Sequence, residues 1–209
     1  MFKLDNVRYK DIVHVKRLDI AGEGVTCFVG KSGGGKTTIL KLLNKLISPT
    51  EGSITYHGEA LDTIDSVAHR KRVIMLRQKP YIFSGTIKEN LLIATRLHQV
   101  EVSEEAMKSA LEAVQLQRDL DRNAKTLSGG EAQRLALARI MLLNPECILL
   151  DEPSSALDEA TEKFIIETIV RHVREKKCAL VMVTHAEAVA KRFGDYIFNV
   201  SEGHIAEVK

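Results

Sequence analysis

Short hydrophobic runs alternate with amphipathic stretches along this sequence. Four mostly apolar runs have the length of buried β-strands: 25–30, 72–76, 147–151 and 179–184. Four segments place apolar residues at the i, i+3, i+4, i+7 spacing of one helix face: Ile39, Leu42, Leu43, Leu46; Met107, Ala110, Leu111, Val114; Ile166, Ile169, Val170, Val173; and Ala186, Val189, Ala190, Phe193. Strands that alternate with helices predict an α/β fold with a largely parallel core sheet.

The pattern changes between residues 79 and 144, where strand-like runs become scarce and helical patterns dominate. We interpret this stretch as a helical subdomain inserted into an α/β core formed by residues 1–78 and 145–209. The sequence contains no long Pro/Gly/Ser linker and no internal repeat. It therefore predicts one domain, 1–209, with a helical insertion.

Composition and charge limit the class of protein. The 209 residues are 44% hydrophobic and 28% charged, which is ordinary for a soluble globular protein. A net charge of +2 and short basic clusters at 69–72 and 174–177 lead us to expect no nucleic-acid partner. No apolar run approaches the roughly 18 residues of a membrane helix, and the N-terminal residues do not resemble a signal peptide. We expect a cytoplasmic protein, and any role at a membrane requires a separate partner chain.

The three cysteines, Cys27, Cys147 and Cys178, are far apart in the sequence and lie in or beside apolar stretches. Metal-binding and disulfide-bonded cysteines usually occur at short, regular spacings. We therefore expect three buried, reduced thiols.

A glycine-rich loop follows the predicted strand at 25–30 and precedes a helix. Residues 30–37 match the pattern G-x-x-x-x-G-K-[ST] completely. Glycines at 33–35 allow the backbone to curl closely around phosphate oxygens, and the N–H groups of the helix start attract anions. In such a loop Lys36 reaches the β- and γ-phosphates and the Thr37 hydroxyl holds Mg²⁺. The alternative is a plain glycine-rich turn, but the strand–loop–helix context favours nucleotide binding.

The predicted strand at 147–151 ends in two adjacent acids, Asp151 and Glu152. Carboxylates at the end of a buried strand are costly unless a cation or a reacting group lies nearby. In nucleotide hydrolysis one carboxylate assists Mg²⁺ and another positions or deprotonates the attacking water. Asp-Glu in isolation would be a polar strand end, but a phosphate loop in the same chain favours the catalytic interpretation.

Residues 125–139 read KTLSGGEAQRLALAR, and two glycines precede a run of good helix formers. Ser128 and Glu131 have the spacing of a capping box, which would satisfy the N–H groups of the helix start. A glycine-rich helix start also binds anions. This segment alone leaves both interpretations open, because capping boxes are common.

Taken together, these residues resemble the nucleotide-binding subunit of ATP-binding-cassette (ABC) proteins. Six motifs occur in the family's order: GKSGGGKT, a glutamine (Gln78) in MLRQKPYIFSGTIKENL, LSGGE, ILLDEP, SALD at 155–158, and His185 in VTH. The resemblance covers nearly the whole chain. It implies an α/β P-loop NTPase fold of the ABC type, with a largely parallel core sheet, an antiparallel N-terminal β region and the inserted helical subdomain.

The resemblance also implies a role for each matching residue. Glu152 would act on the attacking water, with His185 at the γ-phosphate and Gln78 reporting the nucleotide state. Mg²⁺ would be held by Thr37, Gln78 and Asp151. ATP would be bound by Gly30, Ser32, Gly33, Gly34, Gly35, Lys36, Thr37 and Thr38, and across a dimer interface by Ser128, Gly129, Gly130 and Asp158.

Family members usually stack the adenine on an aromatic residue ahead of the phosphate loop. Tyr9 is the nearby candidate for this role, and the alternative is that Tyr9 is a strand residue facing the core. Two departures from the motifs are mild: Glu131 stands where glutamine is commoner, and Ala186 stands where an acid is frequent. Neither departure removes a catalytic group.

In the family, two subunits pack head to tail, and the LSGGE helix of one covers the ATP bound by the other. The resemblance therefore implies a homodimeric ATPase that drives a separately encoded permease at the inner face of the membrane. The chain is also similar to small bacterial ABC ATPases associated with metal efflux, particularly of iron. The alternative is a non-transport ABC ATPase that acts as a scaffold in cell division or iron–sulfur assembly.

Overall fold

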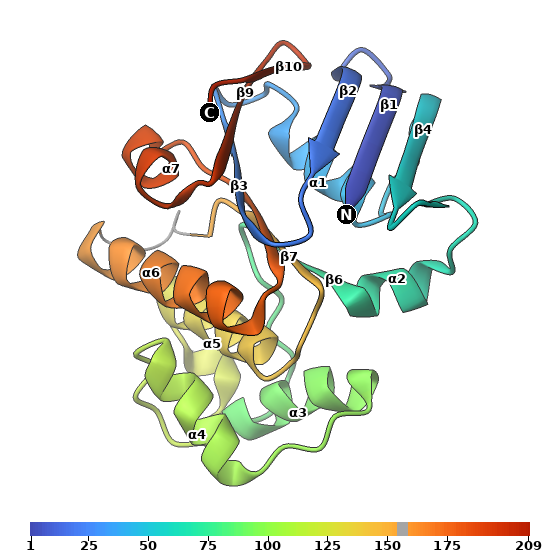
Figure 1. Cartoon of the computed structure of the whole chain (residues 1–209). Coiled ribbons are helices and arrows are strands. Elements are labelled where there is room, and N and C mark those ends of the chain that lie inside the picture. The colour runs from blue at the N-terminus through green and yellow to red at the C-terminus, as the bar shows by residue number, and fades with distance from the viewer. Residues whose placement is uncertain (154–158) are drawn as a thin grey trace. The chain divides into compact units, whose positions relative to one another are not determined.

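The computed structural model describes residues 1–153 and 159–209. This part of the chain divides into two compact units (Figure 1). The first unit consists of Met1–Met75, Glu146–Glu152 and Val173–Lys209, and the second of Leu76–Pro145 and Pro153–His172. The first unit is the α/β part, and the second is helical.

The first unit contains an antiparallel four-stranded sheet with the strand order β2-β1-β4-β5. Phe2 and Leu4 of β1 are fully buried while the residues between them are exposed, as expected for a sheet with one face on the core. The strands are β1 (Phe2–Tyr9), β2 (Val13–Ile20), β4 (Glu51–Tyr56) and β5 (Glu59–Ala60). This sheet confirms the expected antiparallel N-terminal β region.

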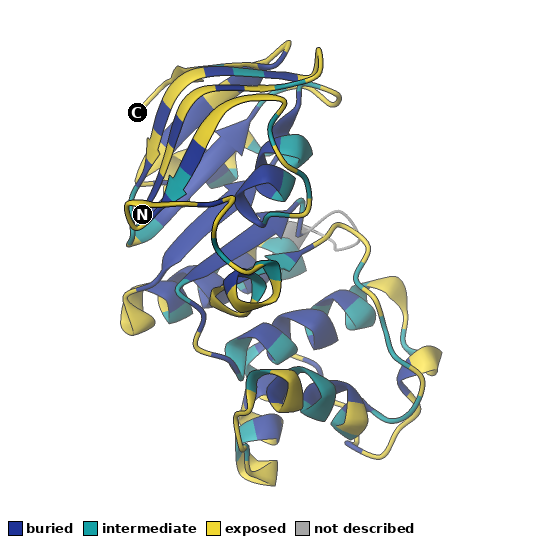
Figure 2. Ribbon diagram, turned by 90° about the vertical axis from the view of Figure 1, so that its right-hand side faces the viewer, coloured by how far each residue is buried: buried dark blue, intermediate teal, exposed yellow. Residues whose placement is uncertain are grey.

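The second sheet has six strands in the order β10-β9-β3-β8-β7-β6. Strand β3 pairs in parallel with β8 and β9, β8 pairs in parallel with β7, and β10 pairs antiparallel with β9. All residues of β7 and β8 are buried (Figure 2), which suits apolar strands covered on both faces. The strands are β3 (Gly24–Val29), β6 (Val73–Leu76), β7 (Cys147–Asp151), β8 (Ala179–Val183), β9 (Tyr196–Ser201) and β10 (His204–Glu207). The expectation of a largely parallel core sheet is confirmed.

Three helices belong to the first unit: α1 (Lys36–Leu43), α2 (Ser66–Arg72) and α7 (Glu187–Phe193). Helix α1 packs against β7 and β8. The predicted helical stripe reached Leu46, but this part of the prediction is wrong because α1 ends at Leu43 and Leu46 is 49% exposed. Lys45 has φ 54°, and the Leu46 amide donates to the Lys41 carbonyl at 2.9 Å. This is the hydrogen bond of a Schellman ending, which turns the chain away from the helix axis.

In the second unit, α5 (Gly129–Met141) packs against α3 (Ile87–His98) and α4 (Glu104–Ala113). A short 3₁₀ helix (Ala124–Thr126) precedes α5. The predicted capping box of α5 is confirmed: the Ser128 amide donates to Glu131 Oε2 at 2.8 Å, and the Glu131 amide donates to Ser128 Oγ at 3.3 Å. Helix α6 is Glu159–Lys176; its residues up to His172 belong to the second unit and those from Val173 to the first. In the described residues no helix has both the length and the apolar character needed to cross a membrane.

The three cysteines are free and buried, as predicted. Burial raises the pKa of the Cys27 thiol to about 12, and it also raises the pKa of Cys147 and Cys178. These groups therefore stay protonated at neutral pH and contribute to core packing.

Candidate nucleotide-binding site

The phosphate loop connects the end of β3 to the start of α1 and is held closely by neighbouring backbone. Gly30 has φ 138°, and a Cβ at this position would lie 2.2 Å from the Val200 carbonyl oxygen. A side chain would meet backbone that cannot move aside, so only glycine fits. The backbone of the loop at Gly30 therefore packs directly against Val200 of β9.

Lys36 begins α1 and is 4% exposed. Its Nζ donates to the carbonyl oxygens of Gly30 at 2.8 Å and Lys31 at 2.7 Å, so the ammonium lies over the loop. Burial lowers the pKa of Lys36, while the nearby carboxylates of Glu152 and Asp151 oppose this shift. A phosphate in the loop would offer this desolvated cation a charged acceptor, which is a stronger partner than a carbonyl.

Thr37 and Asp151 are in direct contact. The Thr37 Oγ1 donates to Asp151 Oδ1 at 2.7 Å, and Asp151 is 7% exposed at the end of β7. A hydroxyl and a carboxylate suit Mg²⁺, which takes oxygen ligands and usually combines one or two carboxylates with substrate phosphates. In the described residues no group of three or more His, Cys, Asp or Glu side chains forms a denser metal site. The residues present therefore fit Mg²⁺ bound together with a nucleotide.

Glu152 and His185 also meet, with His185 Nε2 at 2.5 Å from Glu152 Oε1. Glu152 has φ 49°, and its amide donates to the Val183 carbonyl at 3.1 Å. A non-glycine residue with positive φ is uncommon, and such residues cluster at functional sites. The bend turns the chain immediately after β7 and places the Glu152 carboxylate against the histidine that follows β8.

A hollow of about 700 Å³ opens beside the phosphate loop and His185, while Lys36, Thr37, Asp151 and Glu152 do not line it. Its lining includes residues 30–34 of the phosphate loop, His185 and Glu187, as well as residues 199–202 at the end of β9. The structure thus brings the predicted loop and His185 together. The contribution of 199–202 was not predicted from the sequence. The local signal for this segment is Gly203, because glycine is typical of a short turn between two strands.

Other predicted residues lie outside this hollow. Tyr9 ends β1, is half-buried and packs against the core, while the Lys10 ammonium lies 5.4 Å from its ring centroid. Tyr9 does not line the hollow, so stacking on adenine stays a prediction. Gln78, Ser128, Gly129 and Gly130 belong to the second unit, and their contacts with nucleotide or Mg²⁺ also stay predictions. Asp158 lies outside the described residues.

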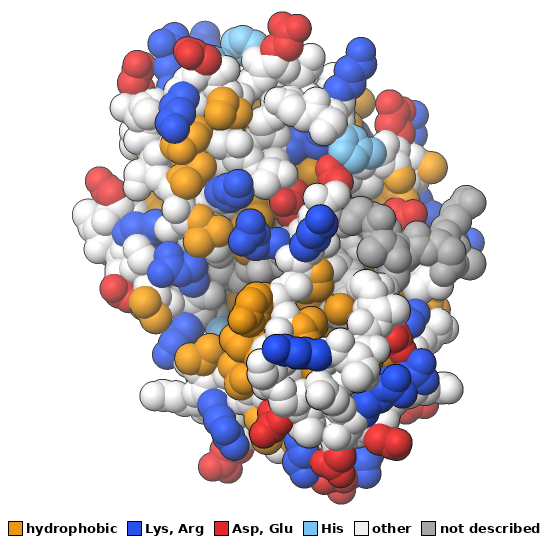
Figure 3. Space-filling view, turned by 180° about the vertical axis from the view of Figure 1, so that it is seen from behind, with side chains coloured by type: hydrophobic (Ala, Val, Ile, Leu, Met, Phe, Trp, Pro, Cys, Tyr) orange, Lys and Arg blue, Asp and Glu red, His pale blue; other side chains and the backbone are white. Residues whose placement is uncertain are grey.

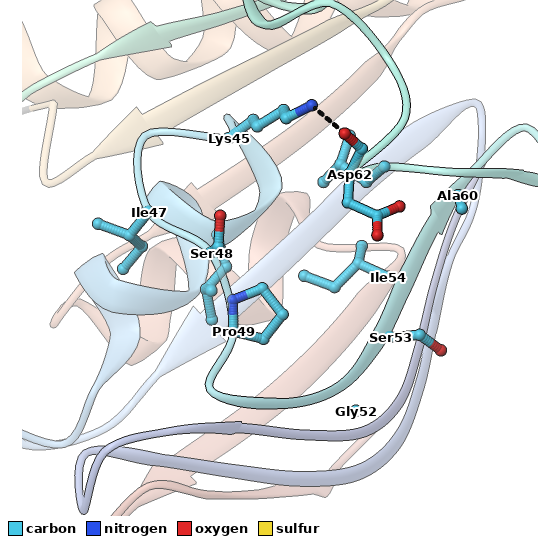
Figure 4. A pocket seen from close by; sticks show the side chains of 11 residues that line it. Lys45, Ile47, Ser48, Pro49, Gly52, Ser53, Ile54, Ala60 and Asp62 are labelled. Carbon is cyan, nitrogen blue, oxygen red and sulfur yellow. Dashed lines mark hydrogen bonds between the residues drawn. The ribbon is translucent and has the colours of Figure 1, made fainter.

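A smaller hollow of about 140 Å³ lies at the far end of α1 (Figure 4). Its lining is mostly apolar and includes Ile47, Pro49 and Ile54. Lys45 Nζ donates to the Asp62 carbonyl at 2.9 Å and also to the Ile64 carbonyl, so its charge is already engaged with backbone. None of the predicted nucleotide-binding residues lines this hollow.

Comparison with known proteins assigns the chain to a family. The family model for "ABC transporter" matches residues 14–155. The chain belongs to the ABC transporter family. The predicted class, an ABC-type ATPase with a P-loop NTPase fold, is thereby confirmed.

Three relatives illustrate the similarity. "Protein STAR1" of Oryza sativa subsp. japonica is 36% identical over 202 residues, which are 96% of this chain but only 58% of that protein. "Putative ABC transporter ATP-binding protein YjkB" of Bacillus subtilis is 32% identical, with coverage of 99% and 82%. The dimeric ATP-binding cassette MJ0796, solved in a post-hydrolysis state with ADP and Pi, superposes with a TM-score of 0.84 at 30% identity, with coverage of 100% and 98%. This chain therefore spans less than two thirds of the rice protein.

Lys36→Ala is expected to weaken ATP binding about 100-fold. A hydrogen bond to a charged group contributes about 1.5–3 kcal/mol, and each 1.4 kcal/mol is about tenfold in affinity. Titration with a fluorescent ATP analogue in the presence of Mg²⁺ measures the change. Lys41→Ala, in the last turn of the same helix, is the matched control and should bind as the wild type does. Equal affinities in the two variants would remove the phosphate loop as the nucleotide site.

Proposed function

We propose that this chain is the ATP-hydrolysing motor subunit of an ABC transporter. It binds Mg-ATP at the interface of a head-to-tail homodimer and drives a separately encoded membrane permease. The chain is one ABC ATPase domain, 1–209, with a helical subdomain at 79–144 between core segments 1–78 and 145–209. The observation that carries the proposal is a contrast between glycines. At Gly30 and Gly35 of the phosphate loop, neighbouring backbone occupies the space of a side chain, whereas at Gly129 in the start of α5 no described atom does so.

The first half of the site is the phosphate loop and its acids. Lys36 and the loop amides bind the β- and γ-phosphates. Thr37 and Asp151 would hold Mg²⁺, which would neutralise charge on the phosphate oxygens. Glu152 orients the attacking water and accepts its proton. His185, 2.5 Å from Glu152, fixes the direction of that carboxylate and donates to the γ-phosphate. Gln78 would contact the metal or the water and report the nucleotide state.

The second half of the site is the start of α5. A Cβ added at Gly129 would find no described heavy atom within 4 Å, and Gly129 does not have a positive φ. A glycine in a helix costs about 1 kcal/mol relative to alanine, so the fold of this chain gains nothing from it. A glycine here would allow a phosphate bound by another copy to approach the helix start closely. The helix start would attract that phosphate through its N–H groups and positive potential. Ser128 and Gly130 would bind that γ-phosphate, with Asp158 near the same interface.

Two relatives support the assembly. MJ0796 is a dimer in its solved state with ADP and Pi, and YjkB is an ATP-binding protein of which this chain covers 82%. We expect this chain to act with a membrane protein made as another chain, which would place this subunit at the inner face of the membrane. The γ-phosphate holds two copies together, and hydrolysis removes this link. The free energy of dimerisation therefore depends on whether ATP or ADP is bound.

A docking surface for the permease is formed by the segment at Tyr81 and Phe83. Tyr81 is 72% exposed. Asn90 is fully buried, accepts from the Phe83 amide at 2.9 Å and donates to the Phe83 carbonyl at 3.0 Å. Arg139 of α5 donates to the Tyr81 carbonyl at 2.8 Å and lies 5.7 Å from the Phe83 ring centroid. Asn90 of α3 thus fixes the backbone of Phe83, and Arg139 of α5 contacts both aromatic residues.

The face of the molecule seen in Figure 3 carries hydrophobic side chains in separate groups, with Lys and Arg side chains among them. Apolar groups with a polar rim are typical of protein–protein interfaces. The second candidate function, a scaffold in cell division or iron–sulfur assembly, would use the same nucleotide site without a permease.

Glu152→Gln is expected to bind ATP, to hydrolyse it at least 100-fold more slowly, since a positioned base contributes about 10²–10⁴-fold, and to accumulate as a dimer. Phosphate release and size exclusion with Mg-ATP measure the two effects. Glu175→Gln, at an exposed position in α6, is the control and should hydrolyse ATP normally. A Glu152→Gln protein that stays monomeric with Mg-ATP over a wide concentration range would contradict the dimer.

The Gly129→Ala variant is expected to affect stability and dimerisation in opposite directions. The substitution should leave the protein folded and raise its stability by about 0.4–1 kcal/mol, because alanine restricts the unfolded chain. It should nevertheless reduce ATP-dependent dimerisation and hydrolysis by more than tenfold, since a methyl group would stand where the second copy's phosphate binds.

The control for this variant is Gly22→Ala, where a Cβ would lie 3.8 Å from its nearest neighbour and the φ is not positive. Thermal unfolding, size exclusion and phosphate release are measured on both variants. A Gly129→Ala protein that dimerises and turns over like Gly22→Ala would exclude the head-to-tail arrangement.

Tyr81→Asp should distinguish the transporter from the scaffold. The variant is expected to hydrolyse ATP alone at the wild-type rate but to lose co-purification with a multi-span membrane protein, because the charge blocks the aromatic contact. Leu97→Asp, another exposed apolar residue of the second unit at 64% exposure, is the control and should still co-purify. If the wild-type protein never associates with a membrane protein, the scaffold function is favoured instead.

A further inference from the structure

Three turns of the first unit meet at a single glycine that the motifs do not include. The β9–β10 hairpin has a two-residue turn, Glu202–Gly203, and both residues have positive φ, 50° and 78°. Two positive φ values are typical of the tight type I′ turn, whose twist suits a β-hairpin. The tip of this turn lies beside the phosphate loop and the β1–β2 turn (Figure 1).

Gly203 is hydrogen-bonded to both neighbours. Its amide donates to the carbonyl of Gly34 in the phosphate loop at 3.2 Å. Its carbonyl accepts from the amide of His14 in β2 at 2.8 Å. One peptide residue therefore connects the loop that would bind phosphate to the first strand pair.

The junction leaves no space for a side chain. A Cβ at Gly203 would lie 2.6 Å from the Ile12 carbonyl oxygen, and a Cβ at Gly35 would lie 2.7 Å from the same atom. The Ile12 carbonyl oxygen thus packs against both Gly35 of the phosphate loop and Gly203 of the hairpin turn. Because the obstacle is backbone, a side chain could be accommodated only if one of the three turns moved.

The same junction reaches the predicted adenine-stacking residue. The Ile12 amide donates to the Tyr9 carbonyl at 3.1 Å, which closes the β1–β2 turn. A shift of Ile12 would therefore be passed to the turn that carries Tyr9, as well as to Gly34 and Gly35. The residues just before Gly203, 199–202, line the large hollow.

We propose that Gly203 is a positioning residue of the nucleotide site. It does not touch the nucleotide, but it fixes the phosphate-loop backbone and the β1–β2 turn at one spacing, so that the amides of the loop are already aimed before ATP arrives. Preorganisation of this kind increases affinity because the loop does not have to be ordered on binding. The inference rests on the proposed binding of ATP at this loop.

The chain provides a matched control for this proposal. The β4–β5 hairpin also has a two-residue turn, His57–Gly58, with φ values of 52° and 86°. A Cβ at Gly58 would find no described heavy atom within 4 Å. Gly203 and Gly58 thus share their turn position and backbone conformation, and they differ in the crowding by Ile12 and the bond to Gly34.

The experiment compares Gly203→Ala with Gly58→Ala. Both variants should lose stability because alanine is strained at positive φ, and Gly203→Ala should lose more because its methyl group meets the Ile12 carbonyl oxygen. Gly203→Ala is expected to raise the Kd and KM for Mg-ATP at least tenfold, with kcat changed by less than threefold. Gly58→Ala should keep both constants within twofold of the wild type. A Gly203→Ala protein with the nucleotide affinity of Gly58→Ala would overturn the proposal.

Two further measurements keep the test decisive if Gly203→Ala does not fold. Asparagine tolerates positive φ better than alanine does, so Gly58→Asn should be near the wild type whereas Gly203→Asn should still lose affinity. In the wild-type protein, Mg-ATP should slow hydrogen exchange at the amides of Gly203 and His14 but not at Gly58. Unchanged exchange at Gly203 and His14 would contradict the proposal.

The outcome is distinguishable from a failure of the proposed function. If the wild-type protein does not bind ATP, or if Lys36→Ala binds it normally, the nucleotide site itself is wrong. If Lys36→Ala loses binding and Gly203→Ala retains it, the site stands and only the positioning role of Gly203 fails.

Discussion

The parallel register of β3, β8 and β7 is the constraint on which the rest of the site depends. Phe28 pairs with Val183, and Val183 pairs with Asp151, so these three residues lie in one row across the sheet. Each strand then leaves the sheet at the same edge: β3 into the phosphate loop, β8 toward His185 and β7 into Glu152. Ligands bind at this carboxyl edge in open α/β sheets. The contacts of Thr37 with Asp151 and of Glu152 with His185 follow directly from this alignment.

The same edge also balances charge. Lys36 is almost fully buried, and its ammonium has been withdrawn from water, which lowers its pKa. The carboxylates of Asp151 and Glu152 oppose that shift. The attraction between the ammonium and the two carboxylates offsets part of the desolvation cost of these groups. Phosphate and Mg²⁺ would add charges of both signs to a site that already contains both. A site built in this way can bind a highly charged ligand without a large net charge on the protein, and the net charge is only +2.

The sequence predicted those features whose signals are local. The strands β3, β6, β7 and β8, the helix start at Lys36 and the capping box at Ser128 each depend on a few adjacent residues. The extension of α1 to Leu46 was wrong because the apolar spacing continued past a helix ending made by Lys45, a residue that rarely adopts a positive φ. The contribution of 199–202 to the large hollow was not predicted, because β9 pairs with β3 from a distant part of the chain and this pairing brings Val200 against Gly30. Position in a sheet, unlike a motif, cannot be derived from neighbours in sequence.

The glycines of this chain separate two kinds of constraint. Gly30 and Gly203 are glycines because other parts of the same chain occupy the space of a side chain: the carbonyl oxygens of Val200 and Ile12 lie where a methyl group would be. Gly129 meets no such obstacle among the described residues and has no need of a positive φ. A residue that weakens its own helix without easing any internal contact is best explained by a contact with another molecule. The first kind of glycine shapes the site within one subunit, and the second leaves an open surface that the proposed dimer would use to bind the nucleotide of a second subunit.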